Sequence, residues 1–206
     1  DLNISSKIIN EMLDTSIIHI FQIIVCVFIC YLIGLVQIGD ILTKRVGIDI
    51  RSSGTGNPGA SNIFNEVGPF LGVLVFFLDV AKGLIPIVIA NFTDIPTVIS
   101  CFASISMLLG HQARLPLKNS GGTGMATAMG SGIGLIPIAA LVSVIPSALI
   151  LLFTKKPSYT GVSAFFITIV AGWLIYMDLL LSVTIFILSA AVLIKFKLQY
   201  QNLSDN

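Results

Sequence analysis

The feature that most constrains this chain is a series of apolar runs, several of which are long enough to cross a lipid bilayer. A membrane-spanning helix takes about 20 residues, because the hydrocarbon core is about 30 Å thick and a helix rises about 1.5 Å per residue. The first run is too long for the hydrophobic part of a signal peptide, so we interpret it as a spanning helix. We predict seven spanning segments, at residues 17–38, 70–90, 95–110, 125–136, 137–153, 159–176 and 179–194.

The composition agrees with a membrane protein. Of the 206 residues, 55% are hydrophobic and 10% are charged, whereas soluble proteins carry about 25% charged residues. Seven spans leave too few residues for a separate soluble domain. We therefore predict a single integral membrane domain over residues 1–206, an all-α polytopic helix bundle with cytoplasmic glycine-rich loops. A net charge of +1 gives no basis for nucleic-acid binding.

The segment 125–136 is the weakest of the seven predicted spans, since it is only about half as long as a bilayer requires. It is rich in glycine, and Gly130 and Gly134 are four residues apart. Small residues at this spacing lie on one helix face and allow a neighbouring helix to approach closely. We expect a short helix that packs tightly against another span.

The basic residues predict the orientation, because cytoplasmic loops of membrane proteins carry an excess of Lys and Arg. If the N-terminus is outside, the inner segments are 39–69, 111–124, 154–158 and the tail after residue 194. These segments hold nine of the eleven basic residues, namely Lys44, Arg45, Arg51, Arg114, Lys118, Lys155, Lys156, Lys195 and Lys197. We predict a plasma-membrane protein with a cytoplasmic C-terminus.

Two inner segments, 47–62 and 110–127, are dense in Gly, Asn, Ser and Thr. Successive glycines allow backbone N–H groups to turn toward one point and bind an anion. A helix that starts at Gly124 would add its free N–H groups and its dipole. Arg51, Arg114 and Lys118 add positive charge. The two segments indicate a phosphate-bearing ligand at the cytoplasmic surface, although tight turns between helices are the simpler alternative.

Other ligand classes have little support. Gly54, Gly56 and Gly59 match the spacing of a dinucleotide-binding loop, but the next element is a membrane span and Pro58 interrupts the turn. No Gly-Lys-Ser/Thr phosphate loop is present, and two distant histidines without clustered cysteines give no metal site. We predict no metal and no cofactor.

Asp79 and Lys82 lie near the middle of the segment 70–90. Ionisable groups at this depth are costly and usually face a polar interior, and residues three apart share a helix face and can pair. We expect an ion pair that fixes helix packing, or that braces or lines the ligand site. A transporter is a further alternative, although no internal repeat is present.

The residues of both glycine segments resemble the bacterial acyl-phosphate:glycerol-3-phosphate acyltransferases of the PlsY type. The likeness runs from about Tyr31 to Thr127. Its best stretch is 54–62, Gly-Thr-Gly-Asn-Pro-Gly-Ala-Ser-Asn, followed by Asp79-Val-Ala-Lys82-Gly83, and by Gly110-His111 with Gly121-Gly122-x-Gly124. The resemblance implies seven spans and an active site on the cytoplasmic face.

The resemblance also implies the reaction and its residues. An acyl group would pass from acyl phosphate to glycerol 3-phosphate, giving lysophosphatidate for phospholipid synthesis. The implied catalytic residues are Thr55, Asn57 and His111. The phosphate-binding residues implied by the two motifs are Gly56, Gly59, Asn62 and the loop Gly121, Gly122, Thr123 and Gly124. For their positive charge near these motifs we add Arg51, Arg114 and Lys118 as candidate phosphate-binding residues.

The sequence departs from the family pattern at two basic positions. Asn65 stands where the family has arginine, and Thr123 where it has lysine. Each hydrogen bond to a charged group contributes about 1.5–3 kcal/mol, so the two losses correspond to about 10²–10⁴ in rate. The alternative function is therefore a non-catalytic relative that binds a phosphorylated ligand or lipid.

Overall fold

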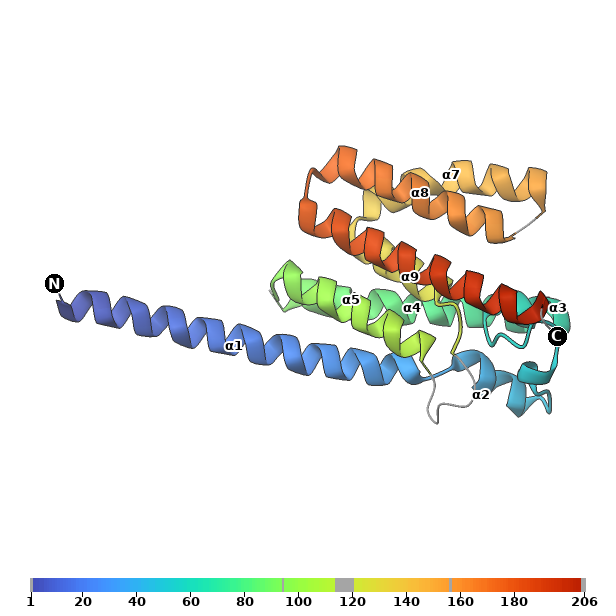
Figure 1. Ribbon diagram of the computed structural model, residues 1–206, viewed down its shortest axis with the longest axis horizontal. Coiled ribbons are helices and arrows are strands. Elements are labelled where there is room, and N and C mark those ends of the chain that lie inside the picture. The colour runs from blue at the N-terminus through green and yellow to red at the C-terminus, as the bar shows by residue number, and fades with distance from the viewer. Residues whose placement is uncertain (1, 94, 114–120, 156, 205–206) are drawn as a thin grey trace.

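A computed structural model gives the structure of the chain, and it describes residues 2–93, 95–113, 121–155 and 157–204. All regular secondary structure in these ranges is helical, which confirms the predicted fold class (Figure 1). The elements are α1 (Leu2–Leu35), α2 (Ile38–Arg45), the 3₁₀ turn η1 (Ile50–Ser52), α3 (Ala60–Glu66), α4 (Pro69–Phe92), α5 (Thr97–Gln112), α6 (Met125–Leu135), α7 (Pro137–Thr154), α8 (Pro157–Tyr176) and α9 (Leu179–Ser204).

Helices lie at all seven predicted segments, but they differ in length. Five stretches are long and apolar enough to span a bilayer: 16–45, 69–92, 137–154, 159–176 and 179–199. The helices α5 and α6, with 16 and 11 residues, are shorter, so their crossing of the membrane stays a prediction. Pro69 and Pro137 begin α4 and α7, since proline at the first helical position has no N–H to leave unpaired.

The helical content differs from the prediction at three places. The last helix, α9, continues to Ser204, beyond the predicted end of its span at residue 194. The first helix begins at Leu2 and ends at Leu35, rather than covering 17–38. The chain then forms α2, η1 and α3 within the polar segment 39–69, where we expected no helix. These elements are short and carry no continuous apolar run, so their sequence lacks the signal that identifies a span.

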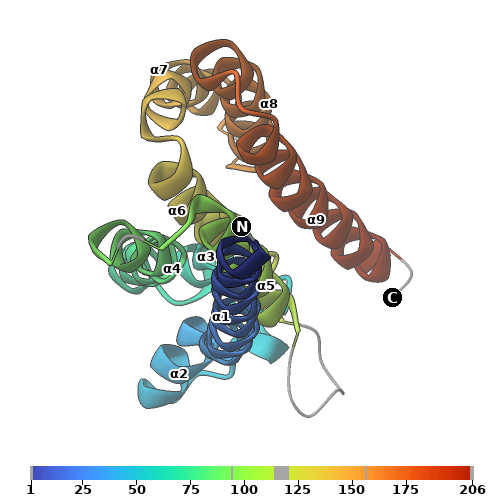
Figure 2. The same ribbon diagram turned by 90° about the vertical axis from the view of Figure 1, so that its left-hand side faces the viewer.

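Three pairs of helices make the most extensive contacts: α1 with α5, α4 with α6, and α7 with α8. A Cβ atom at Gly130 of α6 would collide with the carbonyl oxygen of Val80, and one at Gly134 would lie 2.8 Å from Cδ1 of Ile87. Both neighbours belong to α4. The predicted close approach along these glycines is confirmed. Figure 2 shows α7 and α8 on the opposite side of the bundle from α2.

Large apolar side chains cover much of the surface of the bundle. Phe92 and Phe153, for example, are each 85% exposed. A soluble protein rarely exposes a wide apolar surface, whereas lipid tails solvate one at no cost. The exposed apolar side chains thus fit contact with a bilayer.

The two glycine-rich segments lie at the same end of the bundle. Figure 1 shows α2, α3, the end of α5 and the C-terminal end of α9 toward the right, and the N-terminus at the far left. The connections after α4 and after α8 lie at the opposite end. Polar loops that are distant in sequence are therefore brought together at one end of the bundle.

Candidate active site

The first glycine loop, residues 53–62, is held in shape by the side chain of Asn62. Its Oδ1 accepts a hydrogen bond from the backbone N–H of Thr55 at 3.0 Å. Its Nδ2 donates to the carbonyl oxygens of Ser53 and Asn57, both at 3.0 Å. One buried amide thus satisfies three backbone groups of the loop. Asn62, a predicted phosphate ligand, is engaged with the protein itself.

The same loop turns sharply at Gly56. Its φ of +66° is one that side chains rarely adopt, and its N–H donates to the Ser53 carbonyl at 3.0 Å. Asn57 Oδ1 then accepts from the Gly59 N–H at 3.1 Å. Thr55 is exposed and Asn57 is half-buried. The side chains of Thr55 and Asn57 are therefore among the polar groups that the loop presents at its surface.

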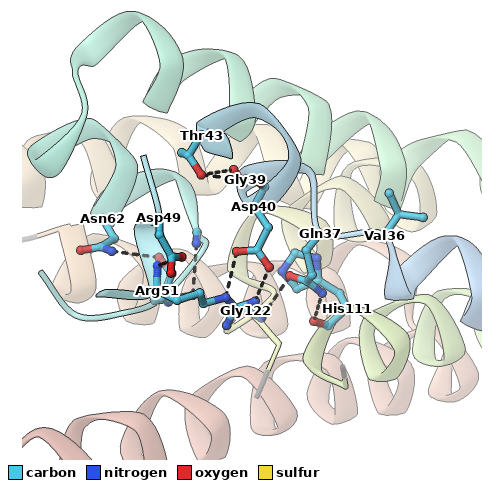
Figure 3. A network of polar contacts seen from close by, with 12 residues as sticks. Val36, Gln37, Gly39, Asp40, Thr43, Asp49, Arg51, Asn62, His111 and Gly122 are labelled. Atoms are coloured by element: carbon cyan, nitrogen blue, oxygen red, sulfur yellow. Dashed lines mark hydrogen bonds and ion pairs between the residues drawn. The ribbon is translucent and has the colours of Figure 1, made fainter. Parts of the chain in front are cut away.

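Arg51, which enters this loop, is fixed by Asp40 of α2. The guanidinium donates from Nε to Oδ1 at 2.8 Å and from Nη2 to Oδ2 at 2.7 Å. Both side chains are about nine-tenths buried. Paired donors of this kind orient an arginine as well as attract it. Figure 3 shows Arg51 reaching across from the first loop toward Asp40, with Gln37 and Gly122 on the far side.

His111, in the last turn of α5, belongs to a buried ionic cluster. Lys82 Nζ lies 2.9 Å from His111 Nδ1, 3.0 Å from the Val36 carbonyl and 3.3 Å from Asp79 Oδ1. Because an ammonium group can only donate, Nδ1 is the acceptor and the ring proton is on Nε2. A Cβ atom at Gly122 would lie only 2.5 Å from Nε2. The imidazole is therefore packed between Lys82 and the second glycine loop, and it is 3% exposed.

The second glycine loop, of which residues 121–124 are described, is held by Gln37 of the α1–α2 junction. Gln37 Nε2 donates to the His111 carbonyl at 2.8 Å, and Oε1 accepts from the Gly122 N–H at 3.3 Å. The Gly121 N–H donates to the Gln112 carbonyl at 3.1 Å. One glutamine thus ties together the two ends of the segment between α5 and α6.

Helix α9 holds the same loop from the other side. Gln112 Nε2 donates to the carbonyl oxygens of Thr123 at 2.9 Å and Ala191 at 3.1 Å. Lys195 Nζ donates to the Gln112 carbonyl at 3.1 Å. The helix that follows, α6, begins after Gly124, as expected. Its first N–H groups have no acceptor within the helix and can serve an anion.

The comparisons with known proteins agree with this arrangement. The sequence matches the family described as Glycerol-3-phosphate acyltransferase over residues 24–206. The chain belongs to this family. It is 36% identical over 152 residues to the glycerol-3-phosphate acyltransferase of Aquifex aeolicus, covering 71% of this chain and 79% of that protein. It is 38% identical over 118 residues to that of Geotalea daltonii, covering 57% of this chain and 61% of that protein.

A solved structure of a family member has the same fold. It is described as PlsY, an integral membrane glycerol 3-phosphate acyltransferase, in its glycerol 3-phosphate form. The TM-score is 0.80 at 28% identity, with 89% of this chain and 92% of that chain covered. The family membership and the apolar surface together make this chain an integral membrane protein.

The predicted site residues of the family divide into two groups in this structure. Thr55 and Asn57 are accessible on the first loop, whereas His111, Asn62 and Gly122 are engaged in contacts within the protein. The N–H groups of four predicted ligands, Gly56, Gly59, Gly121 and Gly122, already have acceptors in the protein. Arg114 and Lys118 lie outside the described residues.

The residues that support the loops, Gln37, Asp40 and Gln112, were not predicted from the sequence. One signal was available, since Gln37 and Asp40 are polar residues at the end of a long apolar run. The partners of these side chains are 74 or more residues away for Gln37, and 11 residues away for Asp40. Sequence spacing does not reveal such partners.

Proposed function

We propose that this protein transfers an acyl group from acyl phosphate to glycerol 3-phosphate, giving lysophosphatidate for phospholipid synthesis. The observation that carries the proposal is the meeting of two glycine loops at one end of the bundle, in a chain of this family. The relatives named above are all glycerol-3-phosphate acyltransferases. This favours the enzyme over a non-catalytic binding protein, and over a transporter.

The proposed reaction does not require a side chain that acts as a nucleophile or as a base. The acceptor hydroxyl attacks the acyl carbonyl carbon, the bond from that carbon to the phosphate oxygen breaks, and the hydroxyl proton leaves with the phosphate. The protein must hold two anions in line and stabilise the oxyanion that forms. Phosphate is a good leaving group and accepts the proton, so no protein base is required.

The structure supports different roles for the predicted residues. Thr55, Asn57 and Thr123 are exposed or half-buried side chains that would contact the substrates, together with backbone N–H groups at the start of α6. Arg51, oriented by Asp40, would supply positive charge. Asn62 and Gly59 would shape the first loop, and His111 would position the second loop rather than accept a proton, because its Nδ1 faces an ammonium group. Gly56, Gly121, Gly122 and Gly124 would set the backbone of the two loops.

An assay of purified protein tests the proposal. With acyl phosphate and glycerol 3-phosphate, lysophosphatidate and phosphate should form in equal amounts, and an acyl thioester should not replace the acyl phosphate. The Aquifex aeolicus relative serves as the positive control. Absence of product under conditions where that relative is active would overturn the proposal.

A second experiment tests the effect of the missing charges. Asn65 lies exposed on α3 and Thr123 is half-buried in the second loop. If the absence of these two positive charges limits the rate, Asn65→Arg and Thr123→Lys should each raise kcat/KM. A gain of about 10-fold or more is expected for one charged hydrogen bond. Unchanged turnover in both variants would show that positive charge at these positions is not limiting.

We further propose that the N-terminus is outside and that the C-terminus and the loops are cytoplasmic. The basic segments gather at the loop end of the bundle, which supports this orientation. A C-terminal reporter that is active only in the cytoplasm should give a signal. A signal from a periplasmic reporter at the same position would overturn it.

A further inference from the structure

The C-terminal end of α9 brings a positively charged side chain to the second glycine loop. Lys195 Nζ donates to the Gln112 carbonyl at 3.1 Å, and Gln112 in turn donates to the Thr123 carbonyl at 2.9 Å. The Lys195 side chain is only partly buried. An ammonium group has three N–H donors, so one bond to a carbonyl leaves two for another acceptor.

The carboxylates of the two ion pairs near the loops have partners other than Lys195. Asp40 pairs with Arg51, and Asp79 pairs with Lys82. Among the residues that the structure describes, no carboxylate forms an ion pair with Lys195. Two further carboxylates, Asp49 and Glu66, lie at the first loop, where Asp49 accepts from the Arg51 N–H and Glu66 lies beside Gly54. The charge of Lys195 at the second loop is thus not neutralised by an ion pair with a described carboxylate.

The positive charges of Lys195 and Arg51 repel each other. Both charges also disfavour a positive charge on His111. The two residues are 144 positions apart in the sequence, Lys195 in α9 and Arg51 in η1, directly before the first loop. Asp40 compensates the charge of Arg51, whereas Lys195 forms no ion pair with a described carboxylate. An anion at the second loop would therefore gain from the positive charge of Lys195.

We propose that Lys195 binds the phosphate group of a substrate of this enzyme, at the second glycine loop. This inference rests on the proposed function, and it gives Lys195 a role in substrate binding besides its contact with the Gln112 carbonyl. The phosphate belongs either to glycerol 3-phosphate or to the acyl phosphate. The two sources have the same chemistry, and kinetics with each substrate varied in turn separates them.

The test uses the full-length protein and the substitution Lys195→Met, which keeps the apolar stem and removes the charge. We expect KM to rise about 10-fold or more for the substrate whose phosphate is bound, as loss of a charged hydrogen bond implies. Lys195→Arg should keep KM within a few-fold. Lys197→Met is the matched control, because Lys197 is an exposed lysine on the same helix, and its KM values should not change.

Inorganic phosphate provides a second readout that needs no turnover. Its binding, measured by calorimetry on the wild type and on Lys195→Met, should weaken by a similar factor in the variant. If the wild type proves inactive with acyl phosphate, the proposed function fails, but this measurement still decides the role of Lys195. If Lys195→Met does not fold, Lys195→Gln replaces it.

A merely structural role for Lys195 gives a different result. It predicts a lower unfolding temperature in detergent with unchanged KM for both substrates and unchanged phosphate binding. That result, or equal effects of Lys195→Met and Lys197→Met, would overturn the proposal.

Discussion

The two glycine loops resemble each other in composition but are supported in different ways. In the first loop, Asn62 bonds to groups that are 5, 7 and 9 residues away. In the second loop, Gln37 bonds to residues 74 and 85 positions away, and Gln112 and Lys195 join it to α9 across about 80 residues. The first loop is thus a local structure, whereas the second exists only when α1, α5 and α9 are assembled.

The largest expected effect comes from Lys82, which contacts the Val36 carbonyl directly after α1, Asp79 and His111. The change Lys82→Met leaves Asp79 buried without its ammonium partner. Loss of one member of a buried pair costs about 3–5 kcal/mol. We expect a large drop in the unfolding temperature in detergent. We also expect faster hydrogen exchange at residues 121–124 than at 53–62, because the second loop depends on the helices.

The double variant Asp79→Asn/Lys82→Met is the control for this prediction. It removes the unpaired charge along with the pair, so it should recover part of the lost stability. Equal increases in exchange at both loops would contradict the comparison, since they would show that the first loop also depends on the bundle.

A smaller effect is expected at Asn62. The change Asn62→Ala removes three hydrogen bonds to the backbone of the first loop, each worth about 1 kcal/mol net. Stability should fall by about 2–3 kcal/mol, with faster exchange confined to residues 53–62. Ser61→Ala, at an exposed neighbouring position, should change neither. Faster exchange at 121–124 in Asn62→Ala would show that the two loops are coupled.

Gln37 offers a graded test of the second loop. Gln37→Met keeps the shape and removes both hydrogen bonds, which should cost about 1–3 kcal/mol because the site is buried. Gln37→Glu keeps the acceptor for the Gly122 N–H but cannot donate to the His111 carbonyl unless it is protonated. If Gln37 positions the loop, kcat should fall in Gln37→Met while the first-loop exchange is unchanged. Loss of stability with normal kcat would leave Gln37 a packing residue only.

The difference between local and long-range contacts also explains which features of the structure could be predicted from the sequence. Apolar runs located the long helices, because burial in lipid requires continuous hydrophobicity. The close approach at Gly130 followed from small-residue spacing within one helix. The pairing of Asp79 with Lys82, three residues apart, was also expected. These features depend on neighbours in the sequence.

Other features depend on the assembled structure. The role of His111 was not predictable, since its environment consists of Lys82 from α4 and Gly122 from the second loop. The supports at Gln37 and Gln112 likewise join elements that only the fold brings together. The first loop is therefore the part of the site that sequence describes best, and it is where a substitution can separate folding from function.

Asn57 provides that separation with the smallest expected effect on stability. Its Oδ1 accepts from the Gly59 N–H, and Asn57→Asp keeps this acceptor, so the free energy of unfolding should change by less than about 0.5 kcal/mol. The added negative charge would lie at the surface that we propose for the substrate phosphates. At a few ångströms it would repel a phosphate by about 1–4 kcal/mol, depending on solvent exposure. KM should therefore rise in Asn57→Asp, more at low than at high ionic strength, since salt screens the repulsion. Unchanged KM at low salt would place the substrates away from the first loop and leave that loop a structural turn.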